Sequence, residues 1–84
     1  MNIYIGNISY RMTDEEIKNV FAPYGNVLSV KIIVDKQTGR SKGYAFVEME
    51  NEEDGQNAIK ALNETEISGR NVKVNLAHKN TDKA

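Results

Sequence analysis

Three aromatic residues, Tyr4, Tyr44 and Phe46, have the spacing of side chains that share one face of a β-sheet. Tyr44 and Phe46 alternate with small or apolar residues, and Tyr4 lies between two isoleucines. Because successive side chains of a strand point to opposite faces, the apolar neighbours should face a core and the three rings should face away from it. Rings on an uncovered face can stack on flat ligands, and a nucleic-acid base stacked on an aromatic ring contributes roughly 1–3 kcal/mol.

Basic and amide side chains are expected to surround these rings. The same alternation places four of them on the face of the rings, and a fifth lies in a neighbouring loop: Lys31, Lys42, Lys73, Asn75 and Arg40. Flexible cations beside aromatic rings match unpaired nucleotides, in which flat bases are joined by phosphates. The pattern therefore indicates a surface for single-stranded nucleic acid.

The residue types that most catalytic and metal sites need are scarce. Cysteine is absent, which excludes disulfides, thiolate nucleophiles and cysteine-ligated metals. The only histidine, His78, lies near the C-terminus, so a metal site or a histidine-based catalytic pair has almost nothing to use. We expect no metal, no cofactor and no enzymatic activity.

Four strands and two helices should position these side chains. Strands are expected at residues 3–5, 27–34, 43–50 and 72–76, and helices at about 14–22 and from Asn51 onward. Thr13 and Glu16 have the spacing of a capping box, and Pro23 and Gly25 should end the first helix. Gly55 falls on the buried face of the second helix, which we interpret as close packing of that helix against the sheet.

The element order βαββαβ is the split βαβ pattern. Right-handed crossovers then place the first and third strands side by side in the centre. We predict an α+β fold, a ferredoxin-like sandwich of a four-stranded antiparallel sheet with both helices on one face. One domain should cover residues 1–78, and residues 79–84 should be a disordered polar tail. The face without helices is where the rings are expected.

The charge balance at first argues against a polyanionic partner, since the net charge is -1 and the pI about 5.8. The charges are segregated, however. The helical segments 13–22 and 51–66 hold eight acidic residues and two lysines, whereas the remainder holds nine basic residues against four acidic ones. We therefore expect an acidic helical side and a positive open face that makes few phosphate contacts and binds with modest affinity.

Two segments identify a family resemblance. Residues 42–49, KGYAFVEM, resemble the octapeptide motif of RNA-recognition motif domains, and residues 3–8, IYIGNI, resemble the family's hexapeptide motif. Both motifs occur in the family's order on the expected strands, and the resemblance covers residues 2 to about 78. The chain also resembles the small single-domain RNA-binding proteins of bacteria and cyanobacteria. Met49 stands where the family usually has an aromatic residue, at a position that the alternation places in the core.

The resemblance implies a role for each matching residue. Tyr4 would stack on one base and Phe46 on its neighbour, while Tyr44 would insert between the two sugars. Lys42 would hold the intervening phosphate. Base edges would be hydrogen-bonded at a rim on and after the last strand: Asn75, Ala77 and His78. The implied partner is single-stranded RNA, with single-stranded DNA bound more weakly.

Plainer interpretations remain for the same residues. The three rings could be ordinary strand aromatics that pack against one another, because strands are enriched in aromatic residues, or a C-terminal segment could cover them. Lys31, Lys73 and Arg40 could each be a solvated surface charge.

Two other functions are compatible with this topology. A protein-interaction module on the same fold is the main alternative, although modules of that kind usually lose the sheet aromatics. An enzyme such as an acylphosphatase would need a phosphate-cradling loop after the first strand. Arg11 is near that place, but residues 7–10 lack the glycines of such a loop.

The surroundings of the protein are suggested by two absences. No apolar run approaches the roughly 20 residues that span a bilayer. The N-terminal residues do not show the pattern of a signal peptide. We expect a monomeric, cytoplasmic protein that does not associate with membranes.

Overall fold

The computed structural model describes residues 1–77 of the 84-residue chain. His78, which was expected at the rim of the binding face, lies outside the described residues, and so does the tail expected at 79–84. The domain limit at residue 78 and the disorder of the tail therefore stay predictions.

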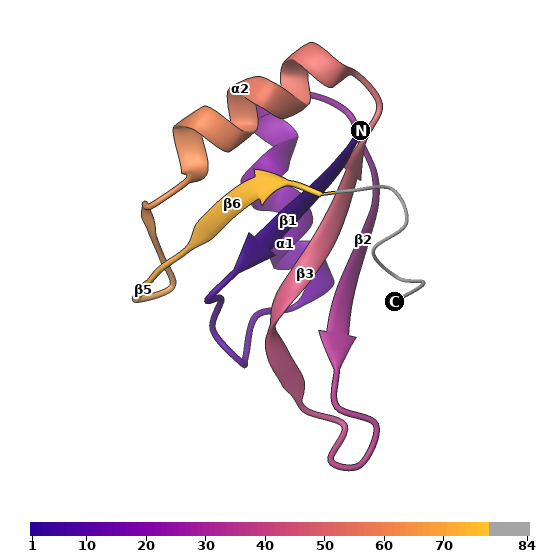
Figure 1. The fold of residues 1–84 in the computed structure, drawn as a ribbon, viewed down its shortest axis with the longest axis vertical. Coiled ribbons are helices and arrows are strands. Elements are labelled where there is room, and N and C mark those ends of the chain that lie inside the picture. Colours follow the sequence, from indigo (N-terminus) through magenta and orange to yellow (C-terminus); the bar gives the residue numbers. More distant parts are fainter. Residues whose placement is uncertain (78–84) are drawn as a thin grey trace.

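A four-stranded antiparallel sheet forms one layer of the molecule. Its strands are β1 (Asn2–Gly6), β2 (Val27–Val34), β3 (Ser41–Met49) and β6 (Lys73–Leu76), in the spatial order β2-β3-β1-β6. Figure 1 shows these strands side by side, with α1 crossing behind β1. The first and third strands are central, which confirms the predicted split βαβ topology.

The two helices begin where their capping residues predict. Helix α1 (Asp14–Phe21) starts after Thr13, whose Oγ1 accepts from the Glu16 amide at 3.2 Å, while Glu16 Oε1 accepts from the Thr13 amide at 2.9 Å. This is the expected capping box. Helix α2 (Glu52–Leu62) starts after Asn51, whose side-chain oxygen accepts from two amides of the first turn.

Helix α1 ends one residue earlier than predicted. The short 3₁₀ helix η1 (Ala22–Tyr24) follows it directly and contains Pro23. Proline has no amide hydrogen to continue the α-helical bonding, so the chain tightens into a 3₁₀ turn and leaves the helix.

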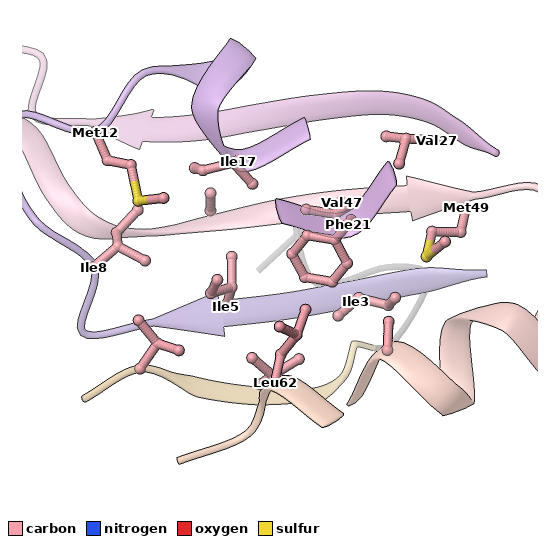
Figure 2. Packing of buried hydrophobic residues seen from close by; sticks show 14 residues of the cluster. Ile3, Ile5, Ile8, Met12, Ile17, Phe21, Val27, Val47, Met49 and Leu62 are labelled. Carbon is pink, nitrogen blue, oxygen red and sulfur yellow. The ribbon is translucent and has the colours of Figure 1, made fainter. Parts of the chain in front are cut away.

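The core lies between the helices and one face of the sheet. It is built from inward residues of the strands and from the apolar stripes of both helices, among them Ile3, Ile5, Ala45, Val47, Val74, Ile17, Phe21 and Ala58. Figure 2 shows the ring of Phe21 close to Ile3 and Val47. Met49 is fully buried, as the alternation predicted. Gly55 is also buried, and a Cβ there would collide with the Met1 sulfur, which confirms the close packing of α2.

The limits of three strands differ from the prediction. Strand β1 extends one residue further at each end, from Asn2 to Gly6. Strand β3 starts at Ser41, two residues earlier than expected, because the Asp35 amide bonds to the Arg40 carbonyl and extends the hairpin. The β2–β3 register shifts between Ile32 and Val34, opposite the part of β3 that contains Gly43, which has a positive φ of 89°. Strand β6 starts at Lys73 because Val72 bonds instead to the backbone of Glu64 and Thr65.

A two-stranded hairpin before β6 was not predicted. It consists of β4 (Glu66–Ile67) and β5 (Arg70–Asn71), joined by a turn in which Ser68 and Gly69 both have positive φ. Each strand has only two residues, too few for the alternation of hydrophobicity that identifies longer strands.

Removing part of the core should destabilise the protein strongly. Ile17 is 0% exposed, and Ile17→Ala should lower the free energy of unfolding by about 2–5 kcal/mol, because it leaves a cavity between α1 and the sheet. This is a large part of the whole free energy of unfolding expected for a chain of this size, about 4–13 kcal/mol at roughly 0.05–0.15 kcal/mol per residue. Urea unfolding followed by circular dichroism measures the change.

The matched control is Leu28→Ala, which truncates an aliphatic side chain that is 52% exposed. This variant should lower the free energy of unfolding by well under half as much as Ile17→Ala, since most of the Leu28 side chain is already in water. Equal losses in the two variants would contradict the placement of the core.

Candidate nucleic-acid interface

The three aromatic residues meet in the middle of the sheet face that carries no helix. Tyr4 in β1 lies opposite Phe46 in β3, and Tyr44 follows one step along the same face, opposite Gly6. The ring centroids are 5.7 Å apart for Tyr4 and Tyr44, 5.9 Å for Tyr4 and Phe46, and 6.1 Å for Tyr44 and Phe46. We call these three residues the aromatic cluster.

The rings of the aromatic cluster are half-buried rather than fully open to water. Their planes are tilted by 35° and 59° for the two pairs that include Tyr4, and Tyr44 meets Phe46 nearly edge-on at 86°. Such tilted pairs attract each other by about 0.5–1.5 kcal/mol beyond the burial of their surface. The rings therefore do pack against one another, as the plainer interpretation held, and this packing also fixes their positions before any ligand arrives.

Gly6 makes room for one of these rings. A Cβ built on Gly6 would lie 2.7 Å from Cζ and 2.8 Å from Cε1 of Tyr4, closer than real Cβ contacts come. The Tyr4 ring thus lies over the backbone of Gly6, next to Tyr44. Alternation along the strand does not predict this role for Gly6, because the contact depends on where the Tyr4 ring lies in the folded chain.

Two of the predicted cations are free to meet a phosphate. Lys31 lies opposite Phe46 in the β2–β3 pairing and is exposed. Lys42 is exposed near the start of β3 and lines the same surface hollow as Tyr44. Neither forms an ion pair within residues 1–77. Arg40 lies in the loop before β3 and lines that hollow too.

Lys73 is placed on the expected face but has an acidic partner. It lies opposite Gly6 in the β1–β6 pairing, and its Nζ is 3.4 Å from Oε2 of Glu64. Both side chains are well exposed, so the pair contributes about 1 kcal/mol or less and a phosphate can compete for the lysine. Because of Glu64, Lys73 is nevertheless a weaker candidate than Lys42 for contact with a phosphate.

The predicted rim is partly described. Asn75 lies opposite Tyr4 in β6 and is exposed. Ala77 continues the pairing by donating its amide to the Asn2 carbonyl at 2.9 Å. Within residues 1–77, no group of three or more acidic, histidine or cysteine side chains is placed to hold a metal, and no helix is long and apolar enough to cross a membrane.

The open face is not positive throughout, which corrects one expectation. Glu48 points to this face and lies opposite both Asn2 and Ser29. With Glu50 and Glu52 it lines a hollow beside Leu76 and Ala77. Glu48 follows Phe46 in β3, Glu50 comes directly after β3, and Glu52 is the first residue of α2, so the three gather at one end of the sheet. A count of charges over helical and non-helical segments cannot show this, because it does not distinguish one end of the sheet face from the other.

The opposite end of the face is basic and holds a larger hollow of about 1200 Å³. We call it the basic hollow. Its lining joins the loop before α1 to the loop before β3 and includes Tyr10, Arg11, Asp35, Arg40, Lys42 and Tyr44. Tyr10 and Arg11 were not predicted as site residues. One feature of the sequence could have indicated them: an aromatic residue stands next to an arginine in a loop, outside the apolar stripe of any helix.

Known proteins resemble this chain along nearly its whole length. The family model described as RNA recognition motif matches residues 3–73. One relative is RbpF of Nostoc sp., which is named as an RNA-binding protein. It is 47% identical to this chain over 83 residues, and the match covers 99% of this chain and 79% of RbpF.

Solved structures share the fold closely. The crystal structure of RNA binding protein PG1 has a TM-score of 0.92 and 44% identity, and the match covers 94% of this chain and 95% of PG1. The Rna15 RRM with bound RNA (GU) has a TM-score of 0.85 and 32% identity, covering 98% of this chain and 92% of that one. The resemblance seen in the two motifs is thus confirmed, and the chain belongs to the RNA recognition motif family.

Proposed function

We propose that this protein binds single-stranded RNA on the open face of its sheet. The observation that carries the proposal is the aromatic cluster, three rings held within 6.1 Å of one another on the face opposite the helices. Family membership supports it, as does the Rna15 RRM, a close structural neighbour whose structure contains RNA.

The rings and the lysine beside them have separate tasks. Tyr4 and Phe46 each stack on one of two neighbouring bases, and Tyr44 lies between the two sugars. Lys42 pairs with the phosphate that joins them, and Lys31 and Arg40 add positive charge on either side. Because the rings already pack against one another, little side-chain freedom is lost on binding.

The binding is expected to be weak and tolerant of sequence. A single face with few free cations should hold about two to four nucleotides, and stacking accepts any base. Single-stranded DNA should bind less well because it lacks the 2′-hydroxyl. We further propose that the protein acts as a cytoplasmic monomer and catalyses no reaction. A protein-interaction module is less well supported, because such modules have no need of aromatic rings on the sheet face that carries no helix.

Removing two rings should weaken binding and leave the fold intact. The double variant Tyr44→Ala/Phe46→Ala should lower the RNA binding free energy by several kcal/mol at most: roughly 1–3 kcal/mol for the base stacked on Phe46, and a further loss for the contact of Tyr44 with the sugars. Fluorescence anisotropy with a labelled oligouridine at fixed salt measures the loss, and far-UV circular dichroism checks the fold. An unchanged affinity would rule out the sheet-face mechanism.

Lys42 should act on the phosphates alone. Lys42→Ala should lower affinity to a similar degree for all RNA sequences and reduce the slope of log K against log salt by about 1. The matched control is Lys60→Ala, which removes the same charge from the exposed side of α2. If Lys42→Ala changes base preference instead, this lysine reads a base.

Gly6 should matter for binding through Tyr4. Gly6→Ala puts a methyl group where the Tyr4 ring lies, so the ring must leave its place beside Tyr44. We expect RNA affinity to fall by about 1–3 kcal/mol, the contribution of one stacked base. Anisotropy titrations measure this loss.

A double-mutant cycle separates this effect from a general disturbance of β1. In a Tyr4→Ala background, Gly6→Ala should change affinity little, because the ring that it displaces is already gone. Equal losses with and without Tyr4 would show that Gly6 acts by another route.

A further inference from the structure

Tyr10 is an aromatic residue that the proposed function does not use. It lies in the loop between β1 and α1 and is 65% exposed, more than any other large apolar or aromatic residue among 1–77. The guanidinium carbon of Arg70 lies over its ring, 5.7 Å from the centroid. The Cε1 edge of the ring lies beside Gly43, where an added Cβ would be 3.3 Å away.

The contacts of Arg70 hold the ring in place. Nη2 of Arg70 donates to Oδ1 of Asn7 at 2.9 Å, and Nε donates to the Asn7 carbonyl at 3.3 Å. Asn7 in turn donates from its side chain to the Asn71 carbonyl at 2.7 Å. The β4–β5 hairpin is thereby tied to the loop that carries Tyr10. An exposed aromatic residue would otherwise be free to change rotamer, so this arrangement prepares a flat surface at low entropic cost.

The basic hollow beside Tyr10 is positively charged. Three cations line it, Arg11, Arg40 and Lys42, against the single carboxylate of Asp35. That carboxylate is already engaged, since Oδ1 accepts from the amides of Gln37 and Thr38 at 2.8 and 3.4 Å. An aromatic surface beside unpaired cations is suited to a base and its phosphate.

The basic hollow is continuous with the aromatic cluster. Tyr44 belongs to both, and Lys42, which we assign to a phosphate of the stacked bases, lines the hollow as well. An RNA strand that leaves the aromatic cluster toward the acidic end of the sheet meets Glu48, Glu50 and Glu52, which repel phosphates. An RNA strand that leaves it toward the basic hollow meets cations.

We propose that the basic hollow binds one further nucleotide of the same RNA strand. Its base stacks on the exposed surface of Tyr10, and its phosphate lies between Arg11 and Arg40. The inference rests on the proposed function, because it extends a strand that is already held on the sheet. An acidic protein segment would be attracted by the same cations but would gain little from the ring.

The test compares short and long RNA. Anisotropy titrations with oligouridines of two and six nucleotides give two dissociation constants for each variant. The dissociation constant of the short RNA divided by that of the long RNA removes effects common to both lengths. For the wild type this ratio should exceed that of Tyr10→Ala by about fivefold or more, the lower end of the range for one stacked base. Tyr10→Phe should keep the wild-type ratio, because it retains the ring.

Leu28→Ala serves as the matched control, since it truncates an exposed side chain in a different hollow, beside Asp14 and Glu15. It should also keep the wild-type ratio. Equal ratios for the wild type and Tyr10→Ala would overturn the inference and leave the proposed function standing if both RNAs bind. Failure of the wild type to bind either RNA would overturn both.

A competition experiment distinguishes the acidic-segment alternative. An oligoglutamate peptide of six residues should displace the labelled hexauridine poorly at fixed salt, because it offers charge without bases. Displacement as efficient as that by unlabelled hexauridine would overturn the inference and identify an acidic-peptide site.

Discussion

The antiparallel pairing of β1 with β3 is the constraint on which the rest of the structure depends. In this register Ile3 lies opposite Val47 and Ile5 opposite Ala45, and all four side chains enter the core. The residues between them must then point to the other face, which brings Tyr4 against Phe46. A slip of one residue would put the rings in the core and the isoleucines in water. The stability of the core and the geometry of the binding face are therefore fixed by one set of hydrogen bonds.

The same face combines two physical effects that act at different places. The aromatic cluster supplies stacking area near the centre of the sheet, where its rings hold one another in position. The charges are divided between the ends, with Glu48 and its acidic neighbours at one and the basic hollow at the other. An RNA strand should thus be centred by stacking and oriented by charge. This arrangement explains how a chain with a net charge of -1 can serve a polyanionic partner.

Periodic and local features could be predicted from the sequence, and tertiary ones could not. Strict alternation placed Tyr44 and Phe46 on one face, and the spacing of Thr13 and Glu16 predicted the capping box. Three features depend on how the chain folds back on itself. They are the ion pair of Lys73 with Glu64, the position of the Tyr4 ring over Gly6, and the hollow that two loops form beside Tyr10. The early start of β3 depends on a loop hydrogen bond that alternation does not report.

The most direct test of the account is a two-dimensional ¹H–¹⁵N NMR titration of the full chain with a six-nucleotide oligouridine. The account predicts that the largest amide shift changes fall on β1 and β3, at Tyr4, Tyr44 and Phe46 and their neighbours, with small changes along the exposed sides of α1 and α2. Changes concentrated on the helices, with β1 and β3 unaffected, would contradict it.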